Sequence, residues 1–330
     1  SIISTSTHDY LLFFTSLGRV YKIKGYKIPN YGRNSKGLPI VNLLNLTDNE
    51  TLAAIMSIKD FEEGYLFFTT AKGVVKRTKV SDFQNIRTNG IRAVSLREGD
   101  ELHSVKLTDG NRDIIIGASN GKAIRFNEQD VRCMGRNAAG VKGISLTKNE
   151  NVIGMTTVSE ERSEILAITQ YGYGKRTDVD EYRLQGRGGM GVKTINVTAK
   201  NGSLTKLISV VGDEDLLVVT DKGMIIRVPI DQIAKTKRST QGVRIINLLD
   251  NHEVATIAIV PKDDACDEYL ENPEEAPCLE NPEIEPKLAA VPDFKLDEYK
   301  EINKVSREDD SGDNEEDTID DIDDMLSDSY

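Results

Sequence analysis

Short apolar runs separated by glycine-bearing polar turns recur along the first 260 residues, with a period near 50 residues. In each copy an apolar run meets a small residue, a Gly follows three positions on, and a basic residue follows four further. β-Branched and aromatic residues on both sides of a short Gly-bearing turn are typical of a β-hairpin. The five predicted hairpins span residues 11–22, 66–77, 114–125, 165–176 and 216–227.

A second phrase follows each hairpin, its Gly 17 to 19 residues after the hairpin Gly. It reads Gly, an apolar residue, two variable residues, an apolar residue, a polar residue and an aliphatic residue, and we interpret it as a third strand. A further apolar stretch before the next repeat predicts a fourth. The copies of the phrase occupy residues 37–43, 90–96, 140–146, 191–197 and 242–248.

Four strands in each repeat of about 50 residues are typical of a propeller blade, because a ring of small sheets buries each face against a neighbour. The pattern therefore predicts an all-β, propeller-like domain over residues 1–260, with little helix. About five four-stranded blades are expected, at residues 8–58, 64–108, 112–158, 163–211 and 214–260.

Composition changes near residue 261. Residues 261–330 carry 26 acidic against 6 basic residues and five prolines after residue 261, which predicts a largely disordered tail. Only its end, 318–326, has apolar residues at helical spacing and could form a short helix on docking. The formal net charge of −12 therefore hides a basic body, because residues 1–260 hold 36 basic against 28 acidic residues.

The basic residues of the body recur at fixed places in the repeats. One lies in the loop before each second phrase, one at the end of the second strand of each hairpin, and one two residues after the Gly of the second phrase. In a ring, equivalent positions form a belt, and a curved belt of Lys and Arg suits duplex DNA that is bent around it. The alternative is that these residues are solvated strand ends or partners of blade carboxylates. The candidate DNA-binding residues are Arg33, Arg77, Arg87, Arg92, Arg125, Arg136, Lys142, Lys175, Arg176, Gln185, Arg187, Gly188, Gly189, Lys193, Arg227, Lys237, Arg238 and Arg244.

The loop of the fourth repeat reads Tyr-Arg-Leu-Gln-Gly-Arg-Gly-Gly-Met-Gly over residues 182–191. It is similar to the gyrase box, Gln-basic-Arg-Gly-Gly-basic-Gly, and the phrases at 4–9 and 39–44 also resemble the C-terminal domain of the DNA gyrase A subunit. Gly186 and Met190 stand where the box is usually basic, so this copy resembles a weakened box. A Gly-rich loop with an exposed Arg lets backbone N–H groups and a guanidinium approach phosphates.

The resemblance covers residues 1 to about 260 and implies a β-pinwheel whose six blades carry the principal box in the first. Because five repeats are visible here, we expect that first blade to be missing. The family resemblance further implies non-sequence-specific wrapping of double-stranded DNA with positive handedness, in support of ATP-dependent negative supercoiling. The implied partners are the gyrase B subunit together with the rest of the gyrase A subunit, in the bacterial cytoplasm at the nucleoid.

The resemblance places catalysis, ATP and Mg²⁺ elsewhere in the parent topoisomerase, so no cofactor, metal or catalytic residue is expected here. No Walker loop, His-Glu-x-x-His motif or paired Cys and His ligands occur, and His8, His103 and His252 are expected to be structural or surface residues. No signal peptide or membrane span is visible, which fits a cytoplasmic fragment of a larger protein.

Three alternatives stay open. Within the family, the corresponding domain of the topoisomerase IV A subunit is expected to bend DNA without strong wrapping. A propeller-like protein-interaction platform would use the same belt for acidic partners. A propeller enzyme would need convergent polar residues at the ring centre, and no repeated Asp, His or Tyr supplies them. The tail either folds back on the basic rim in competition with DNA or only solubilises the protein.

Overall fold

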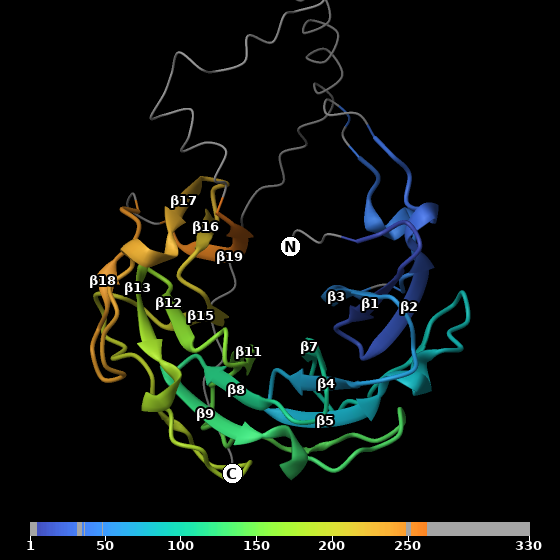
Figure 1. Ribbon diagram of the computed structural model, residues 1–330, viewed down its shortest axis with the longest axis horizontal. Coiled ribbons are helices and arrows are strands. Elements are labelled where there is room, and N and C mark those ends of the chain that lie inside the picture. Colours follow the sequence, from blue (N-terminus) through green and yellow to red (C-terminus); the bar gives the residue numbers. More distant parts are fainter. Residues whose placement is uncertain (1–4, 32–34, 36, 48, 249–251, 263–330) are drawn as a thin grey trace, which may run out of the picture. The chain divides into compact units, whose positions relative to one another are not determined.

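The structure is a computed structural model that describes residues 5–31, 35, 37–47, 49–248 and 252–262 (Figure 1). Of the sequence-based predictions, Arg33 and the conformation of the acidic tail after residue 262 lie outside the described residues. The chain divides into two compact units, and the first, Ser1–Asp267, contains every described residue. Within the described part of the chain, no helix is long and apolar enough to cross a membrane.

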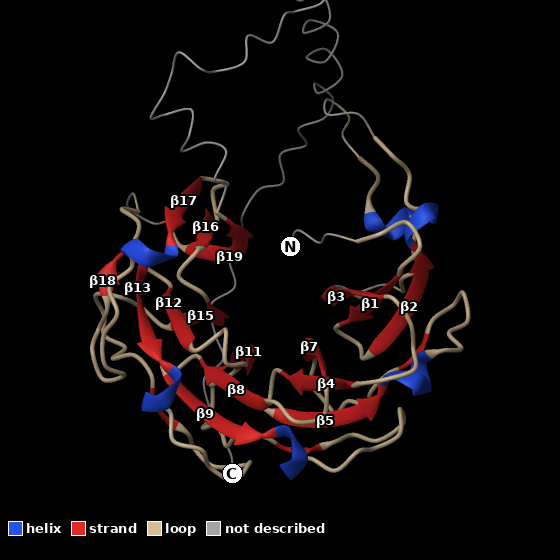
Figure 2. Ribbon diagram, viewed as in Figure 1, coloured by secondary structure: helices blue, strands red, loops and turns tan. Residues whose placement is uncertain are grey.

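Strands dominate the described residues, and the helices are 3-10 turns (Figure 2). The five predicted hairpins are present, each at the centre of an antiparallel sheet, which confirms the all-β fold and the five blades. The strand orders are β3(Leu52–Ile58)-β1(Tyr10–Thr15)-β2(Arg19–Lys24)-β6(Ile91–Arg92) in blade 1, β7(Leu102–Thr108)-β4(Tyr65–Thr70)-β5(Val74–Lys79)-β10(Val141–Lys142) in blade 2, β11(Val152–Val158)-β8(Asp113–Ala118)-β9(Lys122–Asn127)-β14(Val192–Lys193) in blade 3, β15(Leu204–Val210)-β12(Glu164–Thr169)-β13(Tyr173–Asp178)-β18(Val243–Arg244) in blade 4, and β19(Val254–Pro261)-β16(Glu214–Thr220)-β17(Ile225–Pro229) in blade 5.

The 3-10 turns mark the connections that follow the hairpins. Their residues join the second strand of a hairpin to the loop in front of the second phrase, except for η2, which lies within the first copy of that phrase. They are η1(Gly25–Lys27), η2(Ile40–Asn42), η3(Val80–Phe83), η4(Glu128–Asp130), η5(Val179–Glu181) and η6(Ile230–Gln232).

The short strand of the second phrase joins the blade that precedes its own repeat. Thus β14, from the fourth repeat, pairs with β9 of blade 3, with Val192 opposite Ala123 and Lys193 opposite Lys122. The same exchange gives β6 to blade 1, β10 to blade 2 and β18 to blade 4. The interpretation that each repeat builds a blade alone is therefore wrong for this strand, because its pairing partner is a hairpin about 70 residues earlier in the chain.

The exchanged strand covers the turn of the hairpin that it joins. In blade 3 the turn residue Gly121 has a φ of +79°, and its carbonyl accepts hydrogen bonds from the N–H groups of Thr194 and Ile195. A Cβ at Gly121 would lie 2.7 Å from the carbonyl oxygen of Ile195. Both the backbone conformation and the close approach of the second phrase thus require Gly at this turn.

Most of the core lies between successive blades, and one further apolar cluster packs Leu11 and Phe13 of β1 against Leu44. The apolar cluster of blades 1 and 2 joins Phe14 of β1 to Phe68 of β4, whose rings meet edge to face 5.7 Å apart. Further clusters join blades 2 and 3, blades 3 and 4, and blades 4 and 5. The innermost strands also contact each other in chain order, from β3 through β7, β11 and β15 to β19. Each blade therefore depends on its neighbours for burial of its faces.

Among the described residues, blade 5 has three strands, whereas each of the other blades has four. No strand pairs with the free edge of β17 there, and Ile225 on that edge is 62% exposed. The first repeat shows the complementary feature, because its copy of the second phrase forms the turn η2 instead of a strand. Val41 in that turn is 60% exposed.

Candidate nucleic-acid interface

Outer loops connect the 3-10 turn of each repeat to its short exchanged strand, and we define them as residues 84–90, 132–140, 183–191 and 234–242. Each begins just after a buried apolar anchor, namely Phe83, Val131, Tyr182 or Ile233, and each ends at a positive-φ glycine. An apolar anchor at one end and an exchanged strand at the other hold the loop against the preceding blade. The basic side chains within the loop are thereby presented at one edge of the blades.

The structure brings two of the predicted basic positions together between neighbouring repeats. Nη1 of Arg187 donates to the carbonyl oxygen of Lys142 at 3.2 Å, and Nη1 of Arg238 donates to the carbonyl oxygen of Lys193 at 2.9 Å. In both pairs the loop arginine of one repeat lies on the exchanged strand of the preceding repeat. A loop arginine therefore contacts the exchanged strand of the preceding repeat in the same arrangement twice, one blade apart.

We call the resulting set of residues the basic belt. Its members lie in the outer loops or on the exchanged strands, and all are exposed except Arg136 and Arg238, which are half-buried. None of them forms an ion pair closer than 4.0 Å within the described part of the chain, where Arg238 reaches Glu181 at 4.0 Å. The basic belt consists of Arg87, Arg92, Arg136, Lys142, Arg187, Lys193, Lys237, Arg238 and Arg244.

The loop that resembles the gyrase box is fixed by backbone contacts. The N–H of Gly188, whose φ is +84°, donates to the carbonyl of Gly143 at 2.6 Å, and Ser145 donates from its hydroxyl to the carbonyl of Gly188 and from its backbone N–H to the carbonyl of Gly189. Arg187 also donates from Nε to the carbonyl of Asp130 at 3.0 Å. The loop is thus held in one conformation with the Arg187 side chain exposed.

Residues within and just before the fourth-repeat loop differ in exposure. Tyr182 is buried and its hydroxyl contacts that of Thr194, and burial raises its pKa to about 12. Gln185 is half-buried, and its Nε2 has no hydrogen-bond partner among the described residues. Leu184 and Met190 are exposed on either side of Arg187. The loop therefore exposes Arg187 together with the apolar side chains of Leu184 and Met190.

Two fully buried lysines support outer loops from beneath. Lys175 of β13 donates from Nζ to the carbonyls of Lys237 and Arg238 at 2.6 and 2.7 Å, and to the hydroxyl of Thr240 at 3.1 Å. Lys76, at the same position of β5, donates to the carbonyls of Ala93 and Arg136. Burial lowers the pKa of both lysines to about 8. These ammonium groups fix the backbone that carries Arg136 and Arg238, and they are not accessible to a ligand.

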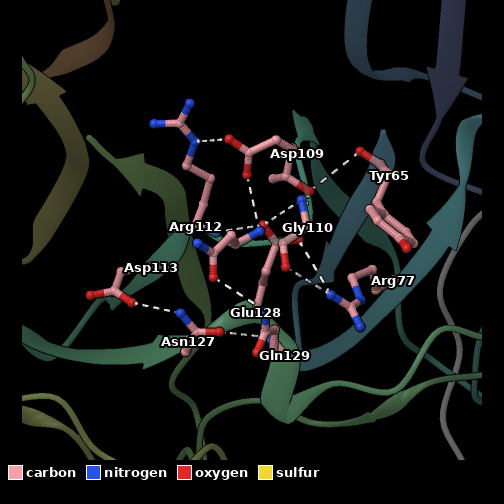
Figure 3. Close-up of polar contacts among 11 residues, drawn as sticks. Tyr65, Arg77, Asp109, Gly110, Arg112, Asp113, Asn127, Glu128 and Gln129 are labelled. Atoms are coloured by element: carbon pink, nitrogen blue, oxygen red, sulfur yellow. Dashed lines mark hydrogen bonds and ion pairs between the residues drawn. The ribbon is translucent and has the colours of Figure 1, made fainter. Parts of the chain in front are cut away.

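The arginines at the strand ends turn inward. Arg77 lies over the ring of Tyr65, donates to the carbonyl of Gly110, and its Nη1 is 3.9 Å from Glu128 (Figure 3). Glu128 is fully buried and accepts hydrogen bonds from the N–H groups of Gly110 and Arg112. This carboxylate therefore ties blade 2 to the third repeat.

The equivalent arginines of blades 3 to 5 are also engaged. Arg125 pairs with Asp113 at 2.8 Å and donates to the carbonyls of Val179 and Tyr182. Arg176 pairs with Glu164 at 2.8 Å, and Arg227 pairs with Asp215 at 2.6 Å. Each carboxylate belongs to the first strand of the same hairpin. These contacts favour the alternative that the strand-end arginines pair with blade carboxylates.

Of the predicted site residues, nine form the basic belt, and Gly188, Gly189 and Gln185 shape its fourth-repeat loop. We leave Arg77, Arg125, Lys175, Arg176 and Arg227 out of the interface, because the four arginines form ion pairs with carboxylates of the blades and Lys175 is fully buried. Recurrence in the sequence did not distinguish the two groups, since an internal ion pair repeats as regularly as a surface charge.

Two further cations of the outer loops, Arg132 and Arg183, were not among the predicted residues. Both are exposed and lie four residues before a belt arginine, Arg136 or Arg187. The signal was present, since the same spacing occurs in two repeats. The role of Lys76 was also missed, and only its buried contacts identify it. Among the described residues, no group of three or more His, Cys, Asp or Glu side chains is arranged to hold a metal ion.

Comparison with known proteins agrees with this architecture. The family described as "DNA gyrase C-terminal domain, beta-propeller" matches five consecutive segments, at residues 9–59, 64–109, 112–159, 163–210 and 214–261. The chain belongs to this family. The five matched segments of the gyrase C-terminal domain coincide with the five hairpins and their innermost strands.

Curated relatives include the DNA gyrase A subunit of Staphylococcus epidermidis, which is 47% identical over 266 residues that make up 80% of this chain and 30% of the relative. The DNA gyrase A subunit of Staphylococcus aureus is 44% identical over 293 residues, 88% of this chain and 33% of the relative. The chain therefore spans about a third of the length of these gyrase A subunits.

Two solved structures share the fold. A C-terminal domain of DNA topoisomerase IV superposes with a TM-score of 0.72 at 25% identity, covering 81% of this chain and 85% of that domain. A DNA gyrase A C-terminal domain superposes with a TM-score of 0.67 at 27% identity, covering 78% of this chain and 85% of that domain. The fold is thus common to the gyrase and topoisomerase IV domains.

Proposed function

We propose that the basic belt binds double-stranded DNA without regard to sequence and bends or wraps it along consecutive blades. The observation that carries this proposal is the repeated contact of a loop arginine with the exchanged strand before it, in the pairs Arg187 with Lys142 and Arg238 with Lys193. Charges that recur from blade to blade match the recurring phosphates of a curved duplex. Phosphate contacts of this kind position DNA but do not read its bases.

Within a DNA gyrase, the belt would serve ATP-dependent negative supercoiling, with DNA cleavage, ATP and Mg²⁺ in other parts of the enzyme. The partners in this proposal are double-stranded DNA, the gyrase B subunit, plus the remainder of the gyrase A subunit, in the bacterial cytoplasm. The matches to gyrase A subunits support it, and the weakened box indicates that the charge is distributed over several loops.

Salt-dependent binding tests the role of the belt. The triple variant Arg136→Gln, Arg187→Gln and Arg238→Gln removes one cation from each of three outer loops. We expect its affinity for a long linear duplex to fall at every sequence, and the slope of log K against log salt to decrease by about 3, roughly one for each phosphate that is no longer neutralised. Fluorescence anisotropy over a salt series measures both.

The matched control is Lys59→Gln, Lys72→Gln and Lys222→Gln, which removes three exposed cations outside the belt. The control should leave the slope within about one of that of the native chain. An equal loss of affinity in the two triple variants would contradict a localised interface. Binding of the native chain that does not depend on salt would favour a protein-interaction platform.

The corresponding domain of topoisomerase IV is the second candidate, because the solved topoisomerase IV domain superposes on this chain with a TM-score of 0.72, against 0.67 for the gyrase domain. Sealing a nicked circle in the presence of the chain separates the two. Gyrase-type wrapping with positive handedness leaves positive supercoils in the sealed circle, whereas bending alone leaves its linking number unchanged.

A further inference from the structure

A cavity of about 450 Å³ is lined by the innermost strands of all five blades. Its wall includes β3, β7, β11, β15 and β19, which contact one another in that order. The volume lies within the range of sites that hold small molecules. It is far too small for duplex DNA, so the cavity is separate from the basic belt.

Three basic side chains line this cavity: His103 and Lys106 on β7 and Lys206 on β15. Neither Lys106 nor Lys206 has an ion-pair partner within 4.0 Å among the described residues. The strand that separates them, β11, contributes Ile153, Gly154 and Met155 to the wall and no charge. Two strands of different blades thus present cations to one cavity.

The carboxylates around the cavity do not balance these cations. Glu101 also lines the cavity, but it forms no ion pair with either lysine. Arg162, which lies near enough to Lys106 to lower its pKa, has its own partner in Glu214. Lys106 is exposed to the cavity and Lys206 is half-buried, and burial together with the charge of Lys206 lowers the pKa of His103. A bound anion would relieve this unfavourable concentration of positive charge.

We propose that the inner cavity binds a small anion with two or more negative charges, of the phosphate or polyphosphate class, between Lys106 and Lys206. The hydroxyl groups of Ser104 and Thr256, which also line the cavity, supply donors that suit phosphate oxygens. Since the two lysines lie on different blades, the anion connects blade 2 to blade 4. This site is independent of the proposed DNA interface.

Isothermal titration calorimetry of the full 330-residue chain with pyrophosphate tests the proposal. We expect one binding site whose affinity falls about a hundredfold in the double variant Lys106→Gln and Lys206→Gln, because each of the two charge-assisted contacts contributes about a factor of ten. The variant Lys106→Arg and Lys206→Arg should retain most of the affinity, since both cations remain.

The matched control is the belt pair Lys142→Gln and Lys193→Gln. It should weaken DNA binding and leave pyrophosphate affinity within about twofold of that of the native chain. The cavity pair Lys106→Gln and Lys206→Gln should weaken pyrophosphate binding and leave DNA affinity within about twofold. Equal loss of pyrophosphate affinity in the two pairs would assign the anion to the belt and overturn the proposal. So would the absence of pyrophosphate binding to the full chain, including the case in which carboxylates of its own acidic tail already occupy the cavity.

Discussion

Blades 3 and 5 are built around hairpins of the same design but end in opposite environments. In blade 3 the exchanged strand β14 pairs with β9, and Ala123 on that edge is buried. In blade 5 no described strand pairs with β17, and the equivalent edge residue Ile225 is exposed. A repeated sequence thus specifies the hairpin, whereas the next repeat decides whether that hairpin is buried.

The two turns show the same difference. Gly121 in blade 3 and Gly223 in blade 5 have φ values of +79° and +81°. A Cβ at Gly121 would meet the carbonyl of Ile195 at 2.7 Å, but a Cβ at Gly223 would meet nothing within 4 Å. The two glycines have the same backbone conformation, but only Gly121 has other residues packed over it. Replacing each by Ala therefore separates the free-energy cost of the conformation from the cost of the packing clash.

The largest effect is expected where the exchanged strand covers a hairpin. Ile195→Ala should lower the free energy of unfolding by about 2 to 5 kcal/mol, because a fully buried side chain is removed and a cavity remains. Val41 is exposed and has the equivalent position in the first copy of the second phrase. Val41→Ala should therefore change the free energy of unfolding by about 0.5 kcal/mol or less. Urea unfolding followed by circular dichroism measures both, and similar losses would show that Val41 is buried in solution.

The turn glycines should give the next largest difference. Gly121→Ala should cost about 3 kcal/mol, since the left-handed conformation costs roughly 1 to 2 kcal/mol and the clash with Ile195 adds to it. Gly223→Ala should cost roughly 1 to 2 kcal/mol, because only the conformation is unfavourable there. Thermal unfolding of the two variants tests this, and an equal cost would mean that the turn of blade 5 is covered too.

A smaller difference is expected at the position of the buried lysines. Lys175→Met removes three hydrogen bonds to the loop at 237–240 and should cost about 1 to 3 kcal/mol. Ile226→Met, at the same position of β17, should cost about 1.5 kcal/mol at most, since it conserves volume. Chemical denaturation at pH 7 compares the two variants. An unchanged free energy of unfolding in Lys175→Met would show that the lysine does not stabilise the loop.

Lys175 also makes stability depend on pH. Its pKa is about 8 in the folded chain, below the ordinary value of 10.5. Between these values the folded chain has released a proton that the unfolded chain retains, so raising the pH favours the folded state. The free energy of unfolding of the native chain should therefore rise relative to Lys175→Met above pH 8. Nuclear magnetic resonance of the lysine ε-methylene should show a titration midpoint near 8, and an ordinary midpoint would contradict burial of the ammonium group.

The smallest effect concerns the backbone alone. Amide hydrogens of β17 should exchange with solvent faster than those of β9 or β13, because no described strand covers the outer edge of β17. Hydrogen–deuterium exchange with mass spectrometry of the intact chain resolves these segments. Equal protection of β17 and β13 would show that another segment pairs with this edge in solution.

In the candidate site, too, the local sequence determines where the cations occur, and contacts between repeats determine which of them are exposed. Arg187 and Arg176 both occur at recurring positions, and the sequence alone predicted a DNA contact for both. Arg187 lies in an outer loop with its side chain exposed, whereas Arg176 pairs with Glu164 and contacts carbonyls of the next repeat. Periodicity identified where the cations recur, but it could not show which of them form ion pairs inside the blades, as Arg176 does with Glu164.

The sequence by itself determined the five hairpins, their glycine turns and the all-β character of the described chain, because side-chain alternation and positive-φ turns act over a few residues. Only the tertiary structure decided which blade receives each exchanged strand, which cations form the basic belt and which, like Lys175, are buried beneath it. These depend on contacts between repeats, where burial and pairing are set by neighbours about 60 to 70 residues away in the chain.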